Sequence, residues 1–213
     1  MAEPEWKQGI IVKIPKKGNI ADCNNWRGIT LLSIPGKIFT LRNIIEQSAE
    51  FQRPLQINFI DFKKAFDSVH RESLWKIVRA YDIPQRFLDT LRNIYLDSSC
   101  CVKIDTGNTE FFHIVTGVRQ DCIISPFLFL LVIDFVMRET MNGSDFGIQW
   151  NNMSRFTDLD FADDIVLLAN TEENLQKMTT ALETTASNVG LRINSEKTNT
   201  FRRVLSHILI VQR

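Results

Sequence analysis

Two adjacent carboxylates, Asp163 and Asp164, lie between two runs of residues that have the pattern of buried strands. The run before them alternates apolar and acidic residues, and the run after them, residues 165–169, is apolar throughout. Because side chains alternate between the two faces of a strand, this pattern predicts a hairpin with the carboxylates at its tip. A buried charge is costly unless something offsets it, so the tip either lies in water or holds a bound cation.

A third carboxylate, Asp61, ends another strand-like run that is apolar on both faces and is therefore predicted to be central. Strict alternation puts Asp61 on the face of Ile57 and Phe59. If the two strands pair side by side, Asp61 comes next to Asp163, and such carboxylates repel unless a cation neutralises them. Hard divalent cations such as Mg²⁺ take oxygen ligands, and two-metal sites of this kind catalyse phosphoryl transfer. For each carboxylate alone, a turn or surface position is the alternative.

The rest of the chain mixes helical and strand patterns. Helices are predicted from Thr40 to about Gln52, after Asp67, after Pro84, from Ser125 as N-cap with Pro126 in the first turn, and from the cap Thr171 to Gly190. A hairpin is predicted over residues 100–114, short strands and loops over residues 10–39, and a last short strand at residues 191–194. This order predicts an α+β fold with an antiparallel sheet backed by helices.

Charge is distributed unevenly along the 213 residues, although the formal net charge is zero. A net charge of zero argues against a simple basic nucleic-acid-binding protein. The first forty-odd residues are basic, whereas residues 156–190 carry seven acids against Lys177 alone. This asymmetry suits a site that holds cations and a polyanion together, and a solvated surface is the alternative.

Nothing in the sequence indicates secretion or a membrane span. The N-terminus lacks the pattern of a signal peptide, and the longest apolar run, residues 126–137, is interrupted by Asp134. The four cysteines do not have the spacing of a zinc site and read as reduced thiols. We therefore expect an intracellular protein, nuclear or cytoplasmic, that has no membrane partner.

Four motifs occur in a fixed order: Asp-Phe-Lys-Lys-Ala-Phe-Asp at 61–67, Gly-Val-Arg-Gln at 117–120 with Ser-Pro at 125–126, Phe-Ala-Asp-Asp at 161–164, and Gly-Leu-Arg-Ile-Asn at 190–194 with Lys197. They resemble motifs A, B, C and D of reverse transcriptases, above all those of non-LTR (LINE-type) retrotransposons. The resemblance implies an α+β right-hand polymerase palm with partial fingers and no thumb. Residues 1–53 would be the partial fingers region, 54–200 the palm, and 201–213 a divergent C-terminal tail.

The resemblance also assigns catalytic roles. Asp61 and Asp163, supported by Asp164, would hold two Mg²⁺ ions, for which Mn²⁺ is a substitute. Lys197 would donate a proton to the leaving pyrophosphate. The implied activity is that of an RNA-directed DNA polymerase, which transfers nucleotides from dNTPs to a DNA primer 3′-OH on an RNA template.

Four further residues would bind the incoming nucleotide. Lys16 and Arg27 would contact the triphosphate, which suits an ammonium and a guanidinium group. Gln120 would pack near the base and sugar, and Phe66 would be a steric gate against the ribose 2′-OH. Without the resemblance, the charged residues read as surface charges and Phe66 reads as an ordinary core residue.

The chain departs from the family pattern at three places. Asp121 stands where the family has glycine, a helix and strand region is missing ahead of motif A, and the sequence after motif D does not look like the family's continuation. These departures suggest a truncated or degenerate copy. The alternatives are therefore a catalytically inactive relic with at most weak nucleic-acid binding, or a metal-dependent palm enzyme that acts on nucleotides without a template.

Overall fold

The computed structural model describes most of the chain, and side chains are described from residue 38 onwards. The described backbone comprises residues 9–15, 26–32, 34–105, 107–119, 122–150, 155–204 and 207–212, and the described side chains are those of 38–105, 107–119, 122–150, 155–160 and 162–202. Lys16, Gln120 and Asp121 therefore lie outside the described residues, and only the backbone of Arg27 is described.

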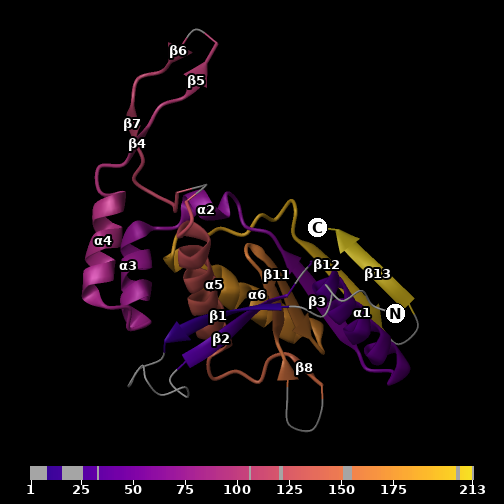
Figure 1. Cartoon of the computed structure of the whole chain (residues 1–213). Helices are drawn as coiled ribbons and strands as arrows, with labels where there is room; N and C mark the ends of the chain where they lie inside the picture. The colour runs from indigo at the N-terminus through magenta and orange to yellow at the C-terminus, as the bar shows by residue number, and fades with distance from the viewer. Residues whose placement is uncertain are drawn as a thin grey trace.

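Five strands form one antiparallel sheet in the spatial order β10-β11-β3-β12-β13 (Figure 1). Their bounds are Asp158–Phe161 (β10), Asp164–Ala169 (β11), Leu55–Ile60 (β3), Asn199–Val204 (β12) and His207–Gln212 (β13). β3 is the middle strand, and five of its six residues are buried. The predicted antiparallel sheet and the central position of β3 are both confirmed.

Helices cover both faces of this sheet. Their bounds are Ile34–Glu50 (α1), Ala65–Ser68 (α2), Arg71–Ala80 (α3), Gln85–Tyr95 (α4), Ser125–Met141 (α5) and Glu172–Asn188 (α6). On one face, α3, α5 and α6 pack with Ile60, Ile165 and Leu167 in the main core. On the other face, Ile44 of α1 packs with Leu55 in a smaller cluster. The chain is therefore an α+β fold, as predicted.

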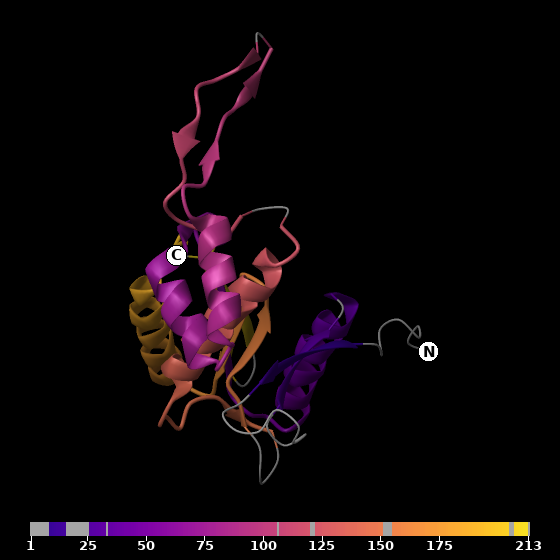
Figure 2. The ribbon, with the colours of Figure 1, turned by 60° about the vertical axis from the view of Figure 1, so that its left-hand side comes forward.

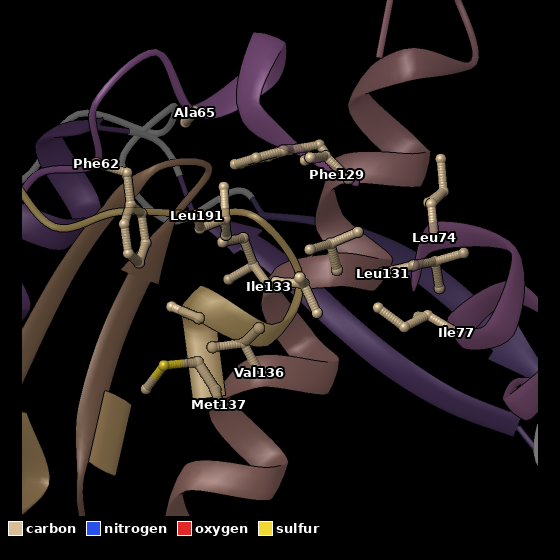
Figure 3. Packing of buried hydrophobic residues seen from close by; sticks show 14 of the residues in the cluster. Phe62, Ala65, Leu74, Ile77, Phe129, Leu131, Ile133, Val136, Met137 and Leu191 are labelled. Atoms are coloured by element: carbon tan, nitrogen blue, oxygen red, sulfur yellow. The ribbon is translucent and has the colours of Figure 1, made fainter. Parts of the chain in front are cut away.

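The main core is centred on α5, which is apolar nearly all round. Figure 3 shows Phe129, Ile133 and Val136 of this helix among side chains from the other elements, including Phe62 just after β3 and Leu191 just after α6. Phe129 and Val136 are fully buried. Because α5 is enclosed in this way, it fixes the position of the segments that follow β3 and α6.

The remaining strands lie outside the central sheet. They are β1 (Gly9–Pro15) with β2 (Trp26–Leu32), β8 (Ile148–Gln149) with β9 (Arg155–Phe156), β4 (Ser99–Cys100) with β7 (Phe112–His113), and β5 (Lys103–Ile104) with β6 (Gly107–Asn108). The last four belong to one long hairpin, residues 99–113, which we call the hairpin arm. It projects away from the ends of α3 and α4 (Figures 1 and 2).

The helix boundaries agree with the sequence at some ends and differ at others. Thr171 caps α6 as predicted, because its Oγ1 accepts a hydrogen bond from the backbone N–H of Asn174 at 3.2 Å. Gly190 follows α6 with a φ of 92°. α1 begins at Ile34 rather than near Thr40, because Pro35 is tolerated in the first turn of a helix.

Two further sequence predictions were wrong in detail. Ser125 is the first residue of α5 rather than its N-cap, and its buried hydroxyl lies 3.2 Å from the hydroxyl of Tyr95 instead. Residues 191–194 do not form a strand: Ile193 makes a single bridge to Phe62.

The boundary proposed between residues 200 and 201 falls inside β12, which joins β3. Among the described helices, none is long and apolar enough to cross a membrane.

Candidate active site

The pairing of β3 with β11 brings the predicted carboxylates to one edge of the sheet. Ile165 lies opposite Ile60 in this antiparallel pair. Continued by one residue, the same register sets Asp164 opposite Asp61, with Asp163 next to them in the turn between β10 and β11. The sequence-based hypothesis that these strands are neighbours is therefore confirmed.

The three carboxylates lie where the sheet meets solvent. Phe62 belongs to the main core (Figure 3), so the preceding residue, Asp61, faces the opposite side of the sheet. Its side chain is 27% exposed, that of Asp163 is half-buried, and Asp164 is exposed. At this position a carboxylate avoids the full cost of burial and can be reached by a ligand.

The turn that carries Asp163 has a strained backbone. β10 and β11 are joined by two residues, Ala162 and Asp163, and Ala162 has a φ of 50°. This left-handed conformation costs an L-residue with a Cβ atom on the order of 1 kcal/mol. Strain of this kind persists only where the surrounding structure enforces it, and here it keeps the hairpin tip tight beside the end of β3.

The segment after α6 completes the surroundings of Asp61. The backbone N–H of Asn194 donates to the carbonyl of Asp61 at 2.8 Å, and its side-chain amide donates to Oδ2 of the same residue at 3.0 Å. Nζ of Lys197 lies 4.0 Å from that Oδ2 atom. Motif D thus contacts motif A directly, and the predicted role of Lys197 as a proton donor stays a prediction.

A cleft of about 700 Å³, which we call the carboxylate cleft, opens beside Asp61. Four of its lining residues are cationic: Lys63, Lys64, Arg192 and Lys197. Three are acidic: Asp61, Asp67 and Glu196. Such a mixture provides cations for phosphate groups and carboxylates for a metal ion within one space.

Motif B packs against motif A through a glycine. Gly117 has a φ of 77°, and a Cβ atom there would come within 2.7 Å of the backbone of Asp67. The backbone N–H groups of Gly117 and Val118 donate at 2.8 Å to the carbonyls of Val69 and Phe66. This close approach sets the start of motif B against α2.

Phe66 has a structural role whatever its contact with substrate. Its ring stacks on that of Phe129 with centroids 4.3 Å apart and an interplanar angle of 18°. The side chain is half-buried at the edge of the main core. One face of the ring is therefore held by α5, and its predicted role as a steric gate stays a prediction.

The carboxylates at this sheet edge match a divalent cation in ligand chemistry. Among the described side chains, no group of three or more His, Cys, Asp or Glu residues is arranged to hold a metal ion. The ligand type does fit, because Mg²⁺ prefers carboxylate oxygens and the register puts Asp61, Asp163 and Asp164 at the same sheet edge. The fit to a metal thus rests on ligand chemistry and strand register.

Other acidic residues of the same hairpin lie apart from this edge. Asp158 is opposite Leu167, which belongs to the main core, so it faces the helices rather than the carboxylate cleft. Burial raises the pKa of Asp158, and the nearby charge of Asp134 raises it further. The hydroxyl of Thr157 donates to this carboxylate. Asp158 is therefore a poor candidate for the metal site.

Of the nucleotide-binding residues predicted from the sequence, Phe66 alone has a described side chain. Lys16 and Gln120 lie outside the described residues, and Arg27 is described only as a backbone partner of Ile14 in β2. Their roles stay predictions.

Several residues of the cleft were not singled out from the sequence. Asn194 was seen as part of motif D, but its bond to Asp61 depends on the path of the chain after α6. Lys63 and Lys64 lie inside motif A, and their position directly after Asp61 was the available signal. Arg192 likewise lies inside motif D, and its position in that motif was the available signal.

Comparison with known proteins gives the same family over nearly the whole chain. The sequence profile described as "Reverse transcriptase (RNA-dependent DNA polymerase)" matches residues 14–209. The chain is 33% identical over 156 residues to the Pol polyprotein of the type-2 retrotransposable element R2DM of Drosophila melanogaster, covering 72% of this chain and 14% of the relative. It is 25% identical over 230 residues to an uncharacterized 149 kDa protein of transposon TX1 of Xenopus laevis, covering 91% and 17%.

Solved structures with the same fold are telomerases. The structure from Candida albicans in complex with a fragment of telomeric RNA has a TM-score of 0.61 and 13% identity, over 85% of this chain and 34% of that one. Apo telomerase from Candida tropicalis has a TM-score of 0.60 and 18% identity, over 78% and 34%. At these identities the likeness shows the fold, which is that of a polymerase palm.

Proposed function

The chain belongs to the reverse transcriptase (RNA-dependent DNA polymerase) family, and we propose that it extends the 3′ end of a DNA primer with deoxynucleotides copied from an RNA template. Its relatives are Pol polyproteins of R2 retrotransposable elements, and one structural neighbour holds a fragment of telomeric RNA. The chain spans only 14% of the length of the R2DM polyprotein and 17% of that of the TX1 protein, so the activity of such a whole protein is part of the proposal.

The observation that carries the proposal is the approach of Lys197 to Asp61 at the sheet edge where Asp163 and Asp164 also lie. A polymerase needs carboxylates that hold cations at the reacting phosphate and a proton donor on the leaving-group side. Of the three carboxylates, Asp61 lines the carboxylate cleft together with Lys197, whereas Asp163 and Asp164 lie at the same sheet edge and are not among its lining residues.

In the proposed reaction, the primer 3′ oxygen attacks the α-phosphorus of a dNTP. A new P–O bond forms, the bond from the α-phosphorus to the bridging oxygen breaks, and pyrophosphate leaves. The 3′-OH proton passes to solvent, while the ammonium group of Lys197 protonates the departing pyrophosphate. Two Mg²⁺ ions held by Asp61, Asp163 and Asp164, with Mn²⁺ as a substitute, would supply Lewis acidity when bound.

Other residues position the nucleotide in this proposal. Lys16 and Arg27 contact the triphosphate, and Gln120 packs beside the base and sugar. Phe66, held by its stack on Phe129, excludes a ribose 2′-OH. Lys63 and Lys64, which line the carboxylate cleft, add positive charge for the phosphates.

The test is primer extension on an RNA template with Mg²⁺ and dNTPs, comparing the wild type with Asp163→Asn. Asp145→Asn is the matched control, because Asp145 is fully exposed in the loop before β8. The proposal expects extension that requires the template and survives in Asp145→Asn but not in Asp163→Asn. Extension that ignores the template would instead favour a nucleotide-adding palm enzyme.

A non-catalytic protein that binds nucleic acid is the second candidate function. Asp121 favours it, because a carboxylate in place of the glycine of motif B would repel a nearby triphosphate. Salt-dependent binding to primer–template without nucleotide incorporation, by protein shown to be folded, would support this candidate and reject the polymerase.

A further inference from the structure

Two arginines lie against one tyrosine at the base of the hairpin arm. The guanidinium carbon of Arg71 lies 5.0 Å from the centroid of the Tyr95 ring, and that of Arg119 lies 5.6 Å from it. Among the described residues, neither arginine forms an ion pair with a carboxylate. Two cations held on one ring repel each other, and an anion placed between them would remove that repulsion.

Hydrogen bonds to neutral groups hold Arg71 in place. Its Nε and Nη1 atoms donate to the carbonyls of Gly117 at 3.2 Å and Tyr95 at 3.1 Å, and Nη1 also donates to Oγ of Ser98 at 3.0 Å. Burial lowers the pKa of Arg71, and the charge of Arg119 lowers it too. The guanidinium is therefore preorganised without being neutralised, which is the state of an anion-binding arginine.

Arg119 is exposed and carries its charge towards solvent. Its Nη2 atom donates to the carbonyl of Ile94 at 2.8 Å, and its backbone N–H donates to the Tyr95 hydroxyl at 3.3 Å. Arg119 belongs to motif B, which also contacts α2 of motif A through Val118. The arginine pair is thus fixed to the same framework as the carboxylates.

A chain of clefts connects the arginine pair to the carboxylate cleft. Arg71 and Arg119 both line a cleft of about 550 Å³, which we call the arginine cleft. It shares Asp67 and Thr116 with the carboxylate cleft. A third cleft of about 1070 Å³ also contains Arg71 and Thr116 and continues to His113 at the hairpin arm. Because the three spaces share lining residues and each is about 550 Å³ or larger, they offer far more room than one free phosphate occupies.

The hairpin arm ends this path with exposed aromatic rings. Phe111 is 72% exposed and Phe112 is 49% exposed. The arm projects from the base formed by α3 and α4 and does not lie on the central sheet (Figures 1 and 2). The arginine cleft carries two cations, Arg71 and Arg119, against one acid, Asp67. Exposed rings beside such a cleft are typical of surfaces that stack unpaired bases, whereas paired bases do not offer their faces.

We propose that the arginine cleft and the hairpin arm bind single-stranded nucleic acid, with Arg71 and Arg119 on its phosphates and Phe111 and Phe112 stacked on its bases. This inference rests on the proposed function, because the strand bound here is the unpaired part of the nucleic acid whose paired end lies at the carboxylate cleft. RNA and DNA share this backbone chemistry, so each is tested separately.

The experiment measures dissociation constants by fluorescence anisotropy for a 20-nucleotide RNA, the same sequence as DNA, and a duplex, between 50 and 200 mM salt. The variants are Arg119→Gln and Phe111→Ala. Their matched controls are Arg86→Gln and Phe87→Ala on α4, where Arg86 also lies over an exposed ring, at 5.2 Å from its centroid. Neither control residue lines the three clefts.

We expect Arg119→Gln to weaken single-strand binding about 5- to 10-fold and to lower the slope of log K against log salt by about 0.7, the value of one single-strand phosphate contact. Phe111→Ala should weaken binding about 5-fold or more with no change of slope, because stacking releases no counterions. Both controls should bind like the wild type. A tighter RNA complex would identify the template as the bound strand, and a tighter DNA complex would identify the primer.

Two results would overturn the inference. In the first, Arg119→Gln and Phe111→Ala bind single strands as tightly as their controls, while the wild type still extends a primer. The proposed function then stands without this site. The other is equal losses on duplex and single strands, which would remove the preference for unpaired bases. The two proposals can also separate in the other direction. If both variants lose single-strand binding and the wild type does not extend primers, the binding site stands and the proposed function is rejected.

Discussion

The ammonium nitrogen of Lys197 lies 4.0 Å from Oδ2 of Asp61, although the two residues belong to opposite ends of the described palm. The lysine side chain is 71% exposed, so its pairing with Asp61 contributes little to stability by itself. A test of Lys197 can therefore separate its proposed role at the cleft from an effect on folding.

Replacing Lys197 by glutamine should reduce the rate of nucleotide incorporation about 100-fold with little change in KM for the dNTP, because proton donation to a leaving group contributes roughly 10²–10⁴-fold. The measurement is single-turnover extension at limiting and saturating dNTP, which separates the rate of incorporation from KM. Lys177→Gln, which removes a surface partner of Glu173, is the control and should incorporate nucleotides at the wild-type rate. An unchanged rate in Lys197→Gln would reject the assignment.

Replacing Phe66 by alanine should relax sugar selection and also lower stability by roughly 2–3 kcal/mol, because half of a stacked pair with Phe129 is lost. Incorporation of rNTPs relative to dNTPs and urea unfolding measure the two effects. Phe135→Ala, another half-buried ring of the main core, separates them. It should lower stability while leaving the rNTP/dNTP ratio unchanged, and a matching rise in both variants would make Phe66 an ordinary core residue.

Gly117→Ala should destabilise the protein by more than about 2 kcal/mol. The new Cβ would meet the backbone of Asp67 at 2.7 Å, in addition to the strain of a φ of 77°. Gly143→Ala is the matched control, since Gly143 has a φ of 68° but no atom within 4 Å of its Cβ position. In that variant the free energy of unfolding, measured by heat or urea, should fall by only about 1 kcal/mol. Equal losses would mean that close packing of motif B on motif A is unimportant for stability.

Asp121→Gly should raise the affinity for dNTPs. Two unit charges about 4 Å apart interact by about 4 kcal/mol at an effective dielectric constant of 20, and a third of that energy is already a tenfold effect on binding. Steady-state KM or direct dNTP titration measures the change. Asp121→Asn removes the charge but keeps a side chain, so it separates repulsion from the backbone freedom of glycine. Unchanged or weaker binding in Asp121→Gly would remove repulsion as an explanation.

Asp158→Asn should stabilise the protein at neutral pH and flatten its pH dependence. Because burial raises the pKa of Asp158 above its ordinary value of 3.8, the folded state keeps a proton that the unfolded state has released. Stability from this group is therefore present below pH 3.8 and is lost as the pH rises through the folded pKa. Urea unfolding between pH 4 and pH 8 measures the slope. The control Asp145→Asn should have the same slope of stability against pH as the wild type. An unchanged slope in Asp158→Asn would mean that the buried carboxyl makes no contribution.

Local pattern was sufficient to predict the hairpin that carries Asp163 and the central strand that ends at Asp61. Alternation along β10 and the apolar faces of β3 are properties of short segments, and they appear directly in the residue order. Their side-by-side pairing required a further hypothesis, since a central strand accepts any neighbour. The ordered motifs supplied the reason to choose β11.

Contacts that depend on the path of the chain could not be predicted in this way. Ser125 looked like a helix cap, but the approach of α4 gave its hydroxyl a partner in Tyr95. The link from Asn194 to Asp61 depends on how the chain leaves α6. Strand β13, by contrast, carries an apolar run at residues 208–211, and this local pattern is sufficient to predict a strand there.

The placement of β3 between β11 and β12 has a consequence for the order of events during synthesis. β3 ends at Ile60, whereas its two neighbours begin at Asp164 and Asn199. The ribosome therefore synthesises β3, the strand that precedes Asp61, long before either neighbour. The apolar faces of β3 stay unpaired until about a hundred further residues have been synthesised. Such non-local pairing makes folding slow and leaves aggregation-prone intermediates. We therefore expect the nascent chain to need chaperones until β11 and β12 have been synthesised.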